Sequence, residues 1–358
     1  MKAKTALIFG ISGIAGRALA EHLSATGKWG VIGVSRHAHS DLQIKGAKLI
    51  RCDLMNAAAT RRALKAAGAA THVFYSTWSR QPNEPENCRV NGAMFRSAIE
   101  ASVASAEIRH IALVTGLKHY LGSFDNYAAR ELDTPFTEDQ PRVPGDNFYY
   151  TQEDILFELA KRHGFTWSVA RPHTIIGLAP GNAMNLGTSI AIYATLCRET
   201  GRPFRFPGSP QSYNGLVDMT DAGILAQHLE WEATNRKAAD KAFNVVNGDY
   251  FRWRKMWKLI AGHFGIEPAA YPGRASPLAT ELAGVGRDWA AIVKKYRLKN
   301  NAIEQIAPWW HVDADLGRTQ ECITDMSRSR ELGFLDYRRS FSAFETLFTR
   351  LRKERLIP

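Results

Sequence analysis

Tyr149 and Lys118 are the two residues whose side chains could act together on a polar bond. A phenol can donate a hydrogen bond to an oxygen that gains negative charge during a reaction, and a nearby cation favours that charge. The frequent arrangement Tyr-x-x-x-Lys on one helix is absent, because Glu153 follows Tyr149 by four residues and Asp154 follows Tyr150. Lys118 is therefore the candidate cation. A core tyrosine and a surface lysine are equally good interpretations of the two residues.

A glycine-rich turn near the N-terminus predicts a dinucleotide site. Residues 6–9 have the length of a buried strand, and a helical pattern begins after the third glycine of a Gly-x-x-Gly-x-x-Gly run. In such a turn the glycines permit a sharp bend, close approach of a pyrophosphate and tight helix packing, and the helix N-terminus attracts phosphate. Glycines that serve packing alone are the alternative. The residues expected around the pyrophosphate are Gly10, Ser12, Gly13, Ile14 and Gly16.

The end of the second predicted strand, residues 30–35, carries the candidate selectivity residues. An acidic residue here would bind the ribose hydroxyls of NAD, whereas an arginine accommodates the 2′-phosphate of NADP. The chain has Ser35, Arg36 and His37, which predicts NADPH, although Arg36 could simply be an exposed residue. After a third strand at 48–51, Asp53 and Leu54 are expected at the adenine, or Asp53 caps the next helix.

Polar residues also follow the later predicted strands. In a parallel sheet the carboxyl ends of the strands share one edge, where ligands bind. We expect strands at 72–75, 108–114 and 166–170 and a helix at 87–101. The further cofactor contacts expected from these segments are Ser76, Thr77, Asn91, Thr115, Gly116, Lys118, Tyr149, Pro172, Thr174 and Ile175.

The alternation of strands and helices predicts an α/β fold, a Rossmann doubly wound parallel sheet with a smaller, mostly helical substrate lobe. The alternation stops near residue 177 and returns at about 216–248. We therefore expect a dinucleotide-binding domain at 1–177 plus 216–248. The substrate lobe is expected at 178–215 plus 249–358.

Composition excludes several classes of protein. The 358 residues are 45% hydrophobic, but no apolar run reaches the ~18 residues of a membrane span, so no membrane partner is expected. The net charge of +11 comes from largely scattered basic residues without a recognition motif, which favours an anionic cofactor over nucleic acid. The four cysteines are far apart, which indicates free thiols and a cytoplasmic location. No spacing of His and Cys residues suggests a metal site. A homodimer is possible.

The chain resembles the progesterone 5β-reductase/iridoid synthase-like enone reductases, an atypical branch of the extended short-chain dehydrogenases. The resemblance covers nearly the whole chain and includes Lys-His-Tyr at 118–120 and Asn-Phe-Tyr-Tyr at 147–150. The other matching stretches are 71–78, 86–91, 115–117, 135–139, 153–154, 242–249, 325–329 and 333–334. The resemblance implies that Tyr149 and Lys118 are catalytic and that NADPH delivers a hydride to the β-carbon of an activated C=C bond.

The chain departs from this family at three places. Leu117 stands where the plant enzymes usually carry Arg, and His173-Thr174 replaces the usual Gly-Asn. His37 replaces a second Arg that often helps to hold the 2′-phosphate, so the NADP preference depends mainly on Arg36.

Three functions are compatible with the sequence. The first is NADPH-dependent 1,4-reduction of α,β-unsaturated carbonyl compounds, either steroid-like or small, with the enolate stabilised by Tyr149 and Lys118. The second is a nucleotide-sugar epimerase or dehydratase, which generally needs the missing tyrosine–lysine helix pair. The third is a non-catalytic NADP sensor of the same fold. Positions in the family indicate an apolar substrate pocket, with core packing as the alternative, at Trp78, Phe124, Phe148 and Met184.

Overall fold

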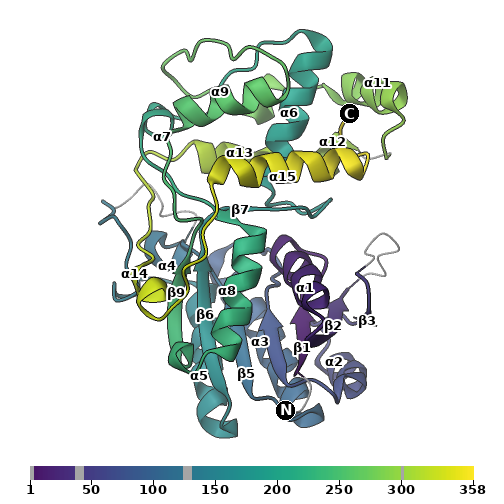
Figure 1. Ribbon diagram of the computed structural model, residues 1–358, viewed down its shortest axis with the longest axis vertical. Helices are drawn as coiled ribbons and strands as arrows, with labels where there is room; N and C mark the ends of the chain where they lie inside the picture. The colour runs from purple at the N-terminus through teal and green to yellow at the C-terminus, as the bar shows by residue number, and fades with distance from the viewer. Residues whose placement is uncertain (1–3, 37–43, 124–130, 300–301) are drawn as a thin grey trace.

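A parallel sheet of seven strands forms the lower part of the protein (Figure 1). The computed structural model describes residues 4–36, 44–123, 131–299 and 302–358, so the predicted site residues His37 and Phe124 lie outside the described residues. The strand order is β3-β2-β1-β4-β5-β6-β9, and every pairing in this sheet is parallel. The strands are β1 (Lys4–Phe9), β2 (Trp29–Ser35), β3 (Ala47–Arg51), β4 (His72–Tyr75), β5 (His110–Val114), β6 (Thr166–Pro172) and β9 (Lys241–Val245).

Helices cover both faces of the sheet, which confirms the predicted doubly wound fold. Residues 6–9 of β1 are fully buried because side chains on both faces of the sheet pack against helices. One face is covered by α1 (Ile14–Thr26) and α8 (Ala222–Thr234). The other face is covered by α2 (Ala57–Leu64), α3 (Glu84–Ser105) and α5 (Phe148–His163). The strand order reverses between β1 and β4, which is where ligands bind in such sheets.

A mostly helical part lies beyond the carboxyl ends of the strands (Figure 1). It has its own core, in which aromatic side chains such as Trp253, Trp257 and Phe344 are buried. Its helices are α6 (Leu186–Thr200), α7 (Pro210–Asn214), α9 (Trp253–His263), α10 (Leu278–Glu281), α11 (Gly286–Tyr296), α12 (Ile303–Ile306), α13 (Trp309–Leu316) and α15 (Ser340–Lys353). The short strands β7 (Ile175–Ile176) and β8 (Thr220–Asp221) pair in parallel. Two further short helices are α4 (Lys118–Leu121) and α14 (Ser327–Glu331).

Helix α3 begins three residues earlier than the sequence pattern indicates, at Glu84 rather than Asn87. The Asn83 side chain accepts a hydrogen bond from the Glu86 N–H, at 3.0 Å, and Pro85 occupies the first turn. Both features favour a helix start, because the cap satisfies a free N–H and proline needs no such bond. The earlier start places Glu84 within the first turn of α3.

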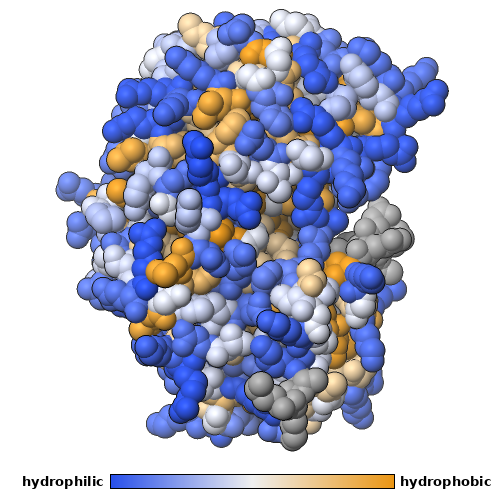
Figure 2. Space-filling model, viewed as in Figure 1, coloured by the Kyte–Doolittle hydropathy of each residue, from blue (hydrophilic) through white to orange (hydrophobic). Residues whose placement is uncertain are grey.

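The face shown in Figure 2 is mostly hydrophilic, with hydrophobic residues in small separate groups. A search of the helices within the described residues finds none whose length and apolar content would let it cross a bilayer.

Candidate active site

Two cavities that share lining residues run along the carboxyl edge of the sheet. The larger, of about 510 Å³, lies over the glycine turn, and we call it the cofactor cleft. The smaller, of about 220 Å³, reaches the ends of β5 and β6 and the side of α13, and we call it the reactive cavity. Residues shared by both are Gly13, Ser76, Thr77, Trp78, Asn182, Met184 and Trp310.

The glycine turn has the geometry that a dinucleotide requires. Gly10 has φ +86°, and a Cβ atom there would lie 2.8 Å from the Ser76 carbonyl oxygen. A Cβ on Gly16 would lie only 2.2 Å from the Gly10 carbonyl oxygen, so the helix can approach the turn because this residue has no side chain. The free N-terminus of α1 follows directly. The residues present therefore fit a bound dinucleotide.

The predicted cofactor residues divide into three groups. Those that line one of the two cavities are Gly10, Ser12, Gly13, Ile14, Ser35, Arg36, Leu54, Ser76, Thr77, Thr115, Gly116, Lys118, Tyr149, Pro172, Thr174 and Ile175. Gly16 acts through packing. Asp53 and Asn91 line neither cavity: Asp53 accepts the Met55 N–H at 3.1 Å, and buried Asn91 holds the loop after β4 through both backbone groups of Ser79.

Lys118 is buried and forms an ion pair with Glu84. Its Nζ lies 2.5 Å from Glu84 Oε2, and the two side chains are 3% and 9% exposed. Glu84 also accepts hydrogen bonds from Asn87 Nδ2 at 3.1 Å and from the Phe148 N–H at 2.9 Å. The carboxylate thus joins the start of α4, the start of α3 and the start of α5. The sequence analysis missed Glu84, and the only local signal for it is an acid in the first turn of a helix that Asn83 caps and that has Pro85 in the same turn.

Tyr149 presents its hydroxyl beside Gly116, at the wall of the reactive cavity. The hydroxyl oxygen would lie 3.6 Å from a Cβ atom on Gly116, so this glycine leaves room next to the phenol. Burial and the negative charge of Glu84 raise the pKa of Tyr149, which keeps the phenol protonated. Among the described residues the Tyr149 hydroxyl has no hydrogen-bond partner, so it can donate to a ligand.

Tyr150 differs from Tyr149 although the two are adjacent. Its hydroxyl donates to the His119 carbonyl oxygen at 2.6 Å and accepts the Val143 N–H at 2.9 Å. Both bonds engage the Tyr150 phenol in joining α4 to the loop that contains Val143. Four residues after Tyr149, where Tyr-x-x-x-Lys would have its lysine, the chain has Glu153. Its Oε2 lies 2.9 Å from Arg142 Nη2, so this carboxylate pairs with an arginine.

Three of the four predicted substrate residues line the reactive cavity. The rings of Trp78 and Phe148 stack, with centroids 5.4 Å apart and an interplanar angle of 12°. Met184 lines the same cavity, and Phe124 lies outside the described residues. This part of the cavity is apolar.

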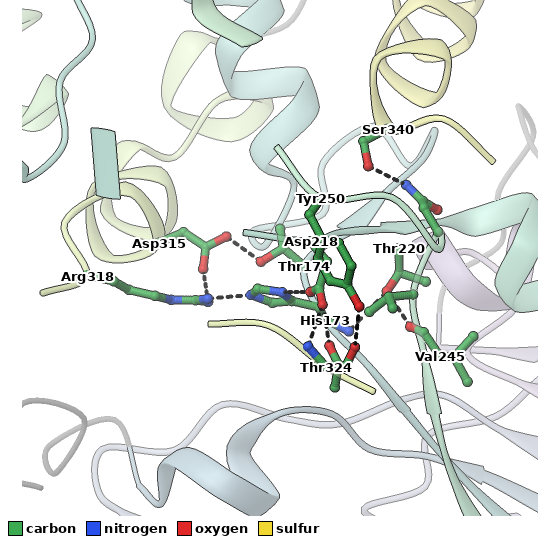
Figure 3. A network of polar contacts seen from close by, with 12 residues as sticks. His173, Thr174, Asp218, Thr220, Val245, Tyr250, Asp315, Arg318, Thr324 and Ser340 are labelled. Atoms are coloured by element: carbon green, nitrogen blue, oxygen red, sulfur yellow. Dashed lines mark hydrogen bonds and ion pairs between the residues drawn. The ribbon is translucent and has the colours of Figure 1, made fainter. Parts of the chain in front are cut away.

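A polar network forms another part of the wall (Figure 3). Asp218 Oδ1 lies 2.6 Å from His173 Nδ1, and Asp218 Oδ2 accepts the Thr324 N–H and hydroxyl, both at 2.6 Å. Arg318 bridges His173 to Asp315, and Thr174 donates to Asp315 at 2.5 Å.

This network joins the end of β6 to α13. The sequence analysis singled out only His173 and Thr174 from it. The i, i+3 spacing of Asp315 and Arg318 is a weak signal of an ion pair, without indication of a cavity. Within the described residues, no group of three or more His, Cys, Asp or Glu side chains could hold a metal ion.

The parallel sheet and the glycine turn define a Rossmann-fold protein. Residues 52–358 match the PRISE-like Rossmann-fold domain, and the chain belongs to that family. Its relatives include a steroid 5-beta-reductase, and the protein is an oxidoreductase.

Full-length relatives agree with this membership. The chain is 39% identical to a 3-oxo-Delta(4,5)-steroid 5-beta-reductase of Arabidopsis thaliana over 364 residues, covering 99% of this chain and 93% of that protein. It is 38% identical to an (S)-8-oxocitronellyl enol synthase of Nepeta racemosa over 362 residues, with the same two coverages.

Solved structures share the fold at low identity. One is a UDP-glucose 4-epimerase of Thermotoga maritima, with a TM-score of 0.68 and 13% identity, covering 98% of this chain and 99% of that chain. Another, of Thermus thermophilus and bound to NAD, has a TM-score of 0.67 and 16% identity, covering 97% and 99%. These likenesses concern the fold alone.

Proposed function

We propose that the protein catalyses NADPH-dependent 1,4-reduction of the C=C bond of α,β-unsaturated carbonyl compounds. The observation that carries this proposal is the Tyr149 hydroxyl, whose raised pKa keeps it protonated and which lies in the wall of a cavity that shares residues with the cofactor cleft. None of the described residues forms a hydrogen bond with it. The names of its relatives, a steroid 5-beta-reductase and an oxocitronellyl enol synthase, support an enone-type substrate.

The residues of the chain would share the work as follows. When bound, NADPH would supply a hydride to the β-carbon of the enone, and a proton from water would then add to the α-carbon to give the saturated carbonyl compound. Tyr149 donates a hydrogen bond to the carbonyl oxygen, which gains negative charge as the enolate forms. Lys118 provides a positive charge in the wall of the reactive cavity. Glu84 holds the Lys118 ammonium in place and partly neutralises its charge. Trp78 and Phe148 exclude water from the reacting bond, which strengthens the Tyr149 hydrogen bond.

The choice of NADPH is supported by the position of Arg36 in the cofactor cleft, next to Ser35. Its planar, permanently charged guanidinium suits a 2′-phosphate. Arg17 and Lys299 also line this cleft, but both form ion pairs with Glu354 of the same lining, at 3.6 and 3.0 Å, so Arg36 remains the main support for NADPH.

A panel of small enones tests the proposal, with NADPH oxidation as the readout and the products identified. We expect saturated ketones or aldehydes, with the carbonyl retained. Allylic alcohols as products would mean that the hydride goes to the carbonyl carbon. Cofactor binding without turnover of any enone would favour the sensor hypothesis instead.

The epimerase hypothesis receives no support from the site. A tyrosine of such enzymes would need a lysine partner on the same helix, and here that position is Glu153, which is buried against Arg142.

A further inference from the structure

Glu354 places a negative charge in the lining of the cofactor cleft, beside two cations of the same lining. Its Oε1 lies 3.6 Å from Arg17 Nη2, and its Oε2 lies 3.0 Å from Lys299 Nζ. The side chains of Arg17, Glu354 and Lys299 are 12%, 32% and 37% exposed, so a ligand in the cleft can reach them. A dinucleotide carries phosphate charges of the same sign as Glu354, and the carboxylate therefore opposes its binding.

The helices that carry these charges do not explain them. Glu354 is the C-cap of α15, and Arg17 is the fourth residue of α1. A helix dipole disfavours a carboxylate at the C-terminus and a cation in the first turn, so each charge is unfavourable for its own helix. Together they are favourable, because Glu354 brings a negative charge to the start of α1. A phosphate is attracted to the same end of that helix, so Glu354 and a phosphate compete for one region.

The Arg17 side chain has a second carboxylate partner, which keeps it in place without Glu354. Its Nε lies 2.9 Å from Glu21 Oε1, one turn further along α1, and the same oxygen lies 2.8 Å from Arg350 Nη2. Lys299 and Glu354 are both partly exposed, and such ion pairs contribute little to stability. The exchange of Glu354 for a phosphate therefore costs the folded protein little.

We propose that Glu354 competes with the phosphate groups of the dinucleotide for Arg17 and Lys299 and thereby lowers the affinity of the protein for its cofactor. The inference rests on the cofactor of the proposed function and not on the enone reaction. NADPH must be replaced after each hydride transfer, and weaker binding favours this exchange. The phosphate concerned is either the pyrophosphate or the 2′-phosphate, and a comparison of two cofactors distinguishes them.

The Glu354→Gln variant tests the inference, since it removes the charge and keeps the size of the side chain. In a fluorescence titration of the full chain at low ionic strength, we expect its Kd for NADPH to be about threefold or more below that of the wild type. A similar gain with NADH would identify the pyrophosphate, which both cofactors carry. A gain confined to NADPH would identify the 2′-phosphate. In about 0.5 M sodium chloride the difference between variant and wild type should shrink, because salt screens it.

Two further variants make the test specific. Glu345→Gln removes the same charge from α15 at a residue that lines neither cavity, so it should leave the Kd unchanged. Lys299→Gln should weaken NADPH binding more in the Glu354→Gln protein than in the wild type, because the ammonium then interacts with the phosphates instead of the carboxylate. Glu354→Ala replaces the Gln variant if that one does not fold.

Three results would overturn the inference. The first is an affinity for NADPH that is unchanged or lower in Glu354→Gln, and the second is an equal gain in Glu345→Gln. The third is an equal cost of Lys299→Gln in both proteins, since Glu354 would then act by general repulsion and not by competition.

These titrations contain no enone, so they separate the inference from the reaction. If the affinities change as expected while no enone is reduced, the proposed reaction fails and the inference stands. If the wild-type protein binds neither NADPH nor NADH, the proposed cofactor fails and the inference fails with it.

Discussion

Nζ of Lys118 lies 2.5 Å from Oε2 of Glu84, in an ion pair that is buried between the starts of α4 and α3. A lysine near a catalytic phenol is expected to favour the negative form of that phenol. Here the Glu84 charge acts in the opposite direction and raises the pKa of Tyr149. The pair therefore favours a phenol that donates a hydrogen bond over a phenolate that accepts a proton, which suits the stabilisation of an enolate oxygen.

Replacing Tyr149 with Phe should slow enone reduction by about 10²–10³, as the loss of one preorganised oxyanion donor does elsewhere. The affinity for NADPH should barely change, because the proposed contact is with the reacting carbonyl. Single-turnover rates and a cofactor titration measure the two effects separately.

Tyr150→Phe is the matched control for that variant. It removes the bonds to His119 and Val143, so it should lower the free energy of unfolding by about 1–2 kcal/mol while most of the turnover persists. An inactive Tyr150→Phe beside an active Tyr149→Phe would show that the catalytic assignment is wrong.

Replacing Glu84 with Gln should reduce stability and shift the pH dependence of the site. The Lys118 ammonium would stay buried without its counter-charge, and breaking such a pair costs about 3–5 kcal/mol. Burial, the larger cause of the raised pKa of Tyr149, persists in this variant, so that pKa should fall only by the contribution of the Glu84 charge. Denaturant unfolding and the alkaline limb of the pH–rate profile measure these effects.

Glu86→Gln provides the control for the Glu84 variant, since Glu86 lies in the same first turn of α3 and pairs with exposed Arg89. It should alter neither the stability nor the pH profile measurably. If Glu84→Gln and Glu86→Gln lower stability and shift the pH profile equally, the cause is the loss of an acid from the first turn of α3. The ion pair with Lys118 would then not explain the changes.

Arg36→Asp should weaken NADPH binding far more than NADH binding. The change removes a charged fork that suits the 2′-phosphate and introduces a carboxylate that repels it. Fluorescence titration with both cofactors provides the comparison. An equal loss for the two would show that Arg36 has only a structural role.

Stability should decline as the pH falls below about 6.5. Burial lowers the pKa of His72 to about 4 and the pKa values of His110 and His119 to about 3, against a usual value of 6.5. The unfolded chain then binds protons that the folded protein does not, so the stabilising contribution of these three histidines is complete above pH 6.5 and is lost below it.

Each of these three histidines can contribute up to about 1.4 kcal/mol per pH unit within this window. Chemical denaturation between pH 7.5 and pH 5, above the range in which ordinary carboxylates titrate, measures the slope. A free energy of unfolding that stays constant over this interval would contradict the prediction.

The local features of the fold could be predicted from the sequence because each depends on neighbouring residues. The turn needs Gly10 at φ +86° and Gly16 against a carbonyl oxygen, and both requirements follow from spacing along a few residues. Buried parallel strands appear as short apolar runs, since both of their faces are covered. Tyr149 and Lys118 were found from their types and from the strand and helix that each one borders. The division into residues 1–177 plus 216–248 and the remaining segments stays a prediction.

Only the tertiary structure identified the partners that decide what these residues can do. Glu84 is 34 residues from Lys118, and Arg318 is 145 residues from His173. No periodic sequence pattern predicts contacts between residues so far apart, because these contacts depend on how distant loops and short helices pack together. The same is true of Thr174 and Asp315, which are 141 residues apart in sequence and share a hydrogen bond. Local spacing determines the turns and strands, whereas side-chain packing between distant segments determines charge, protonation and specificity.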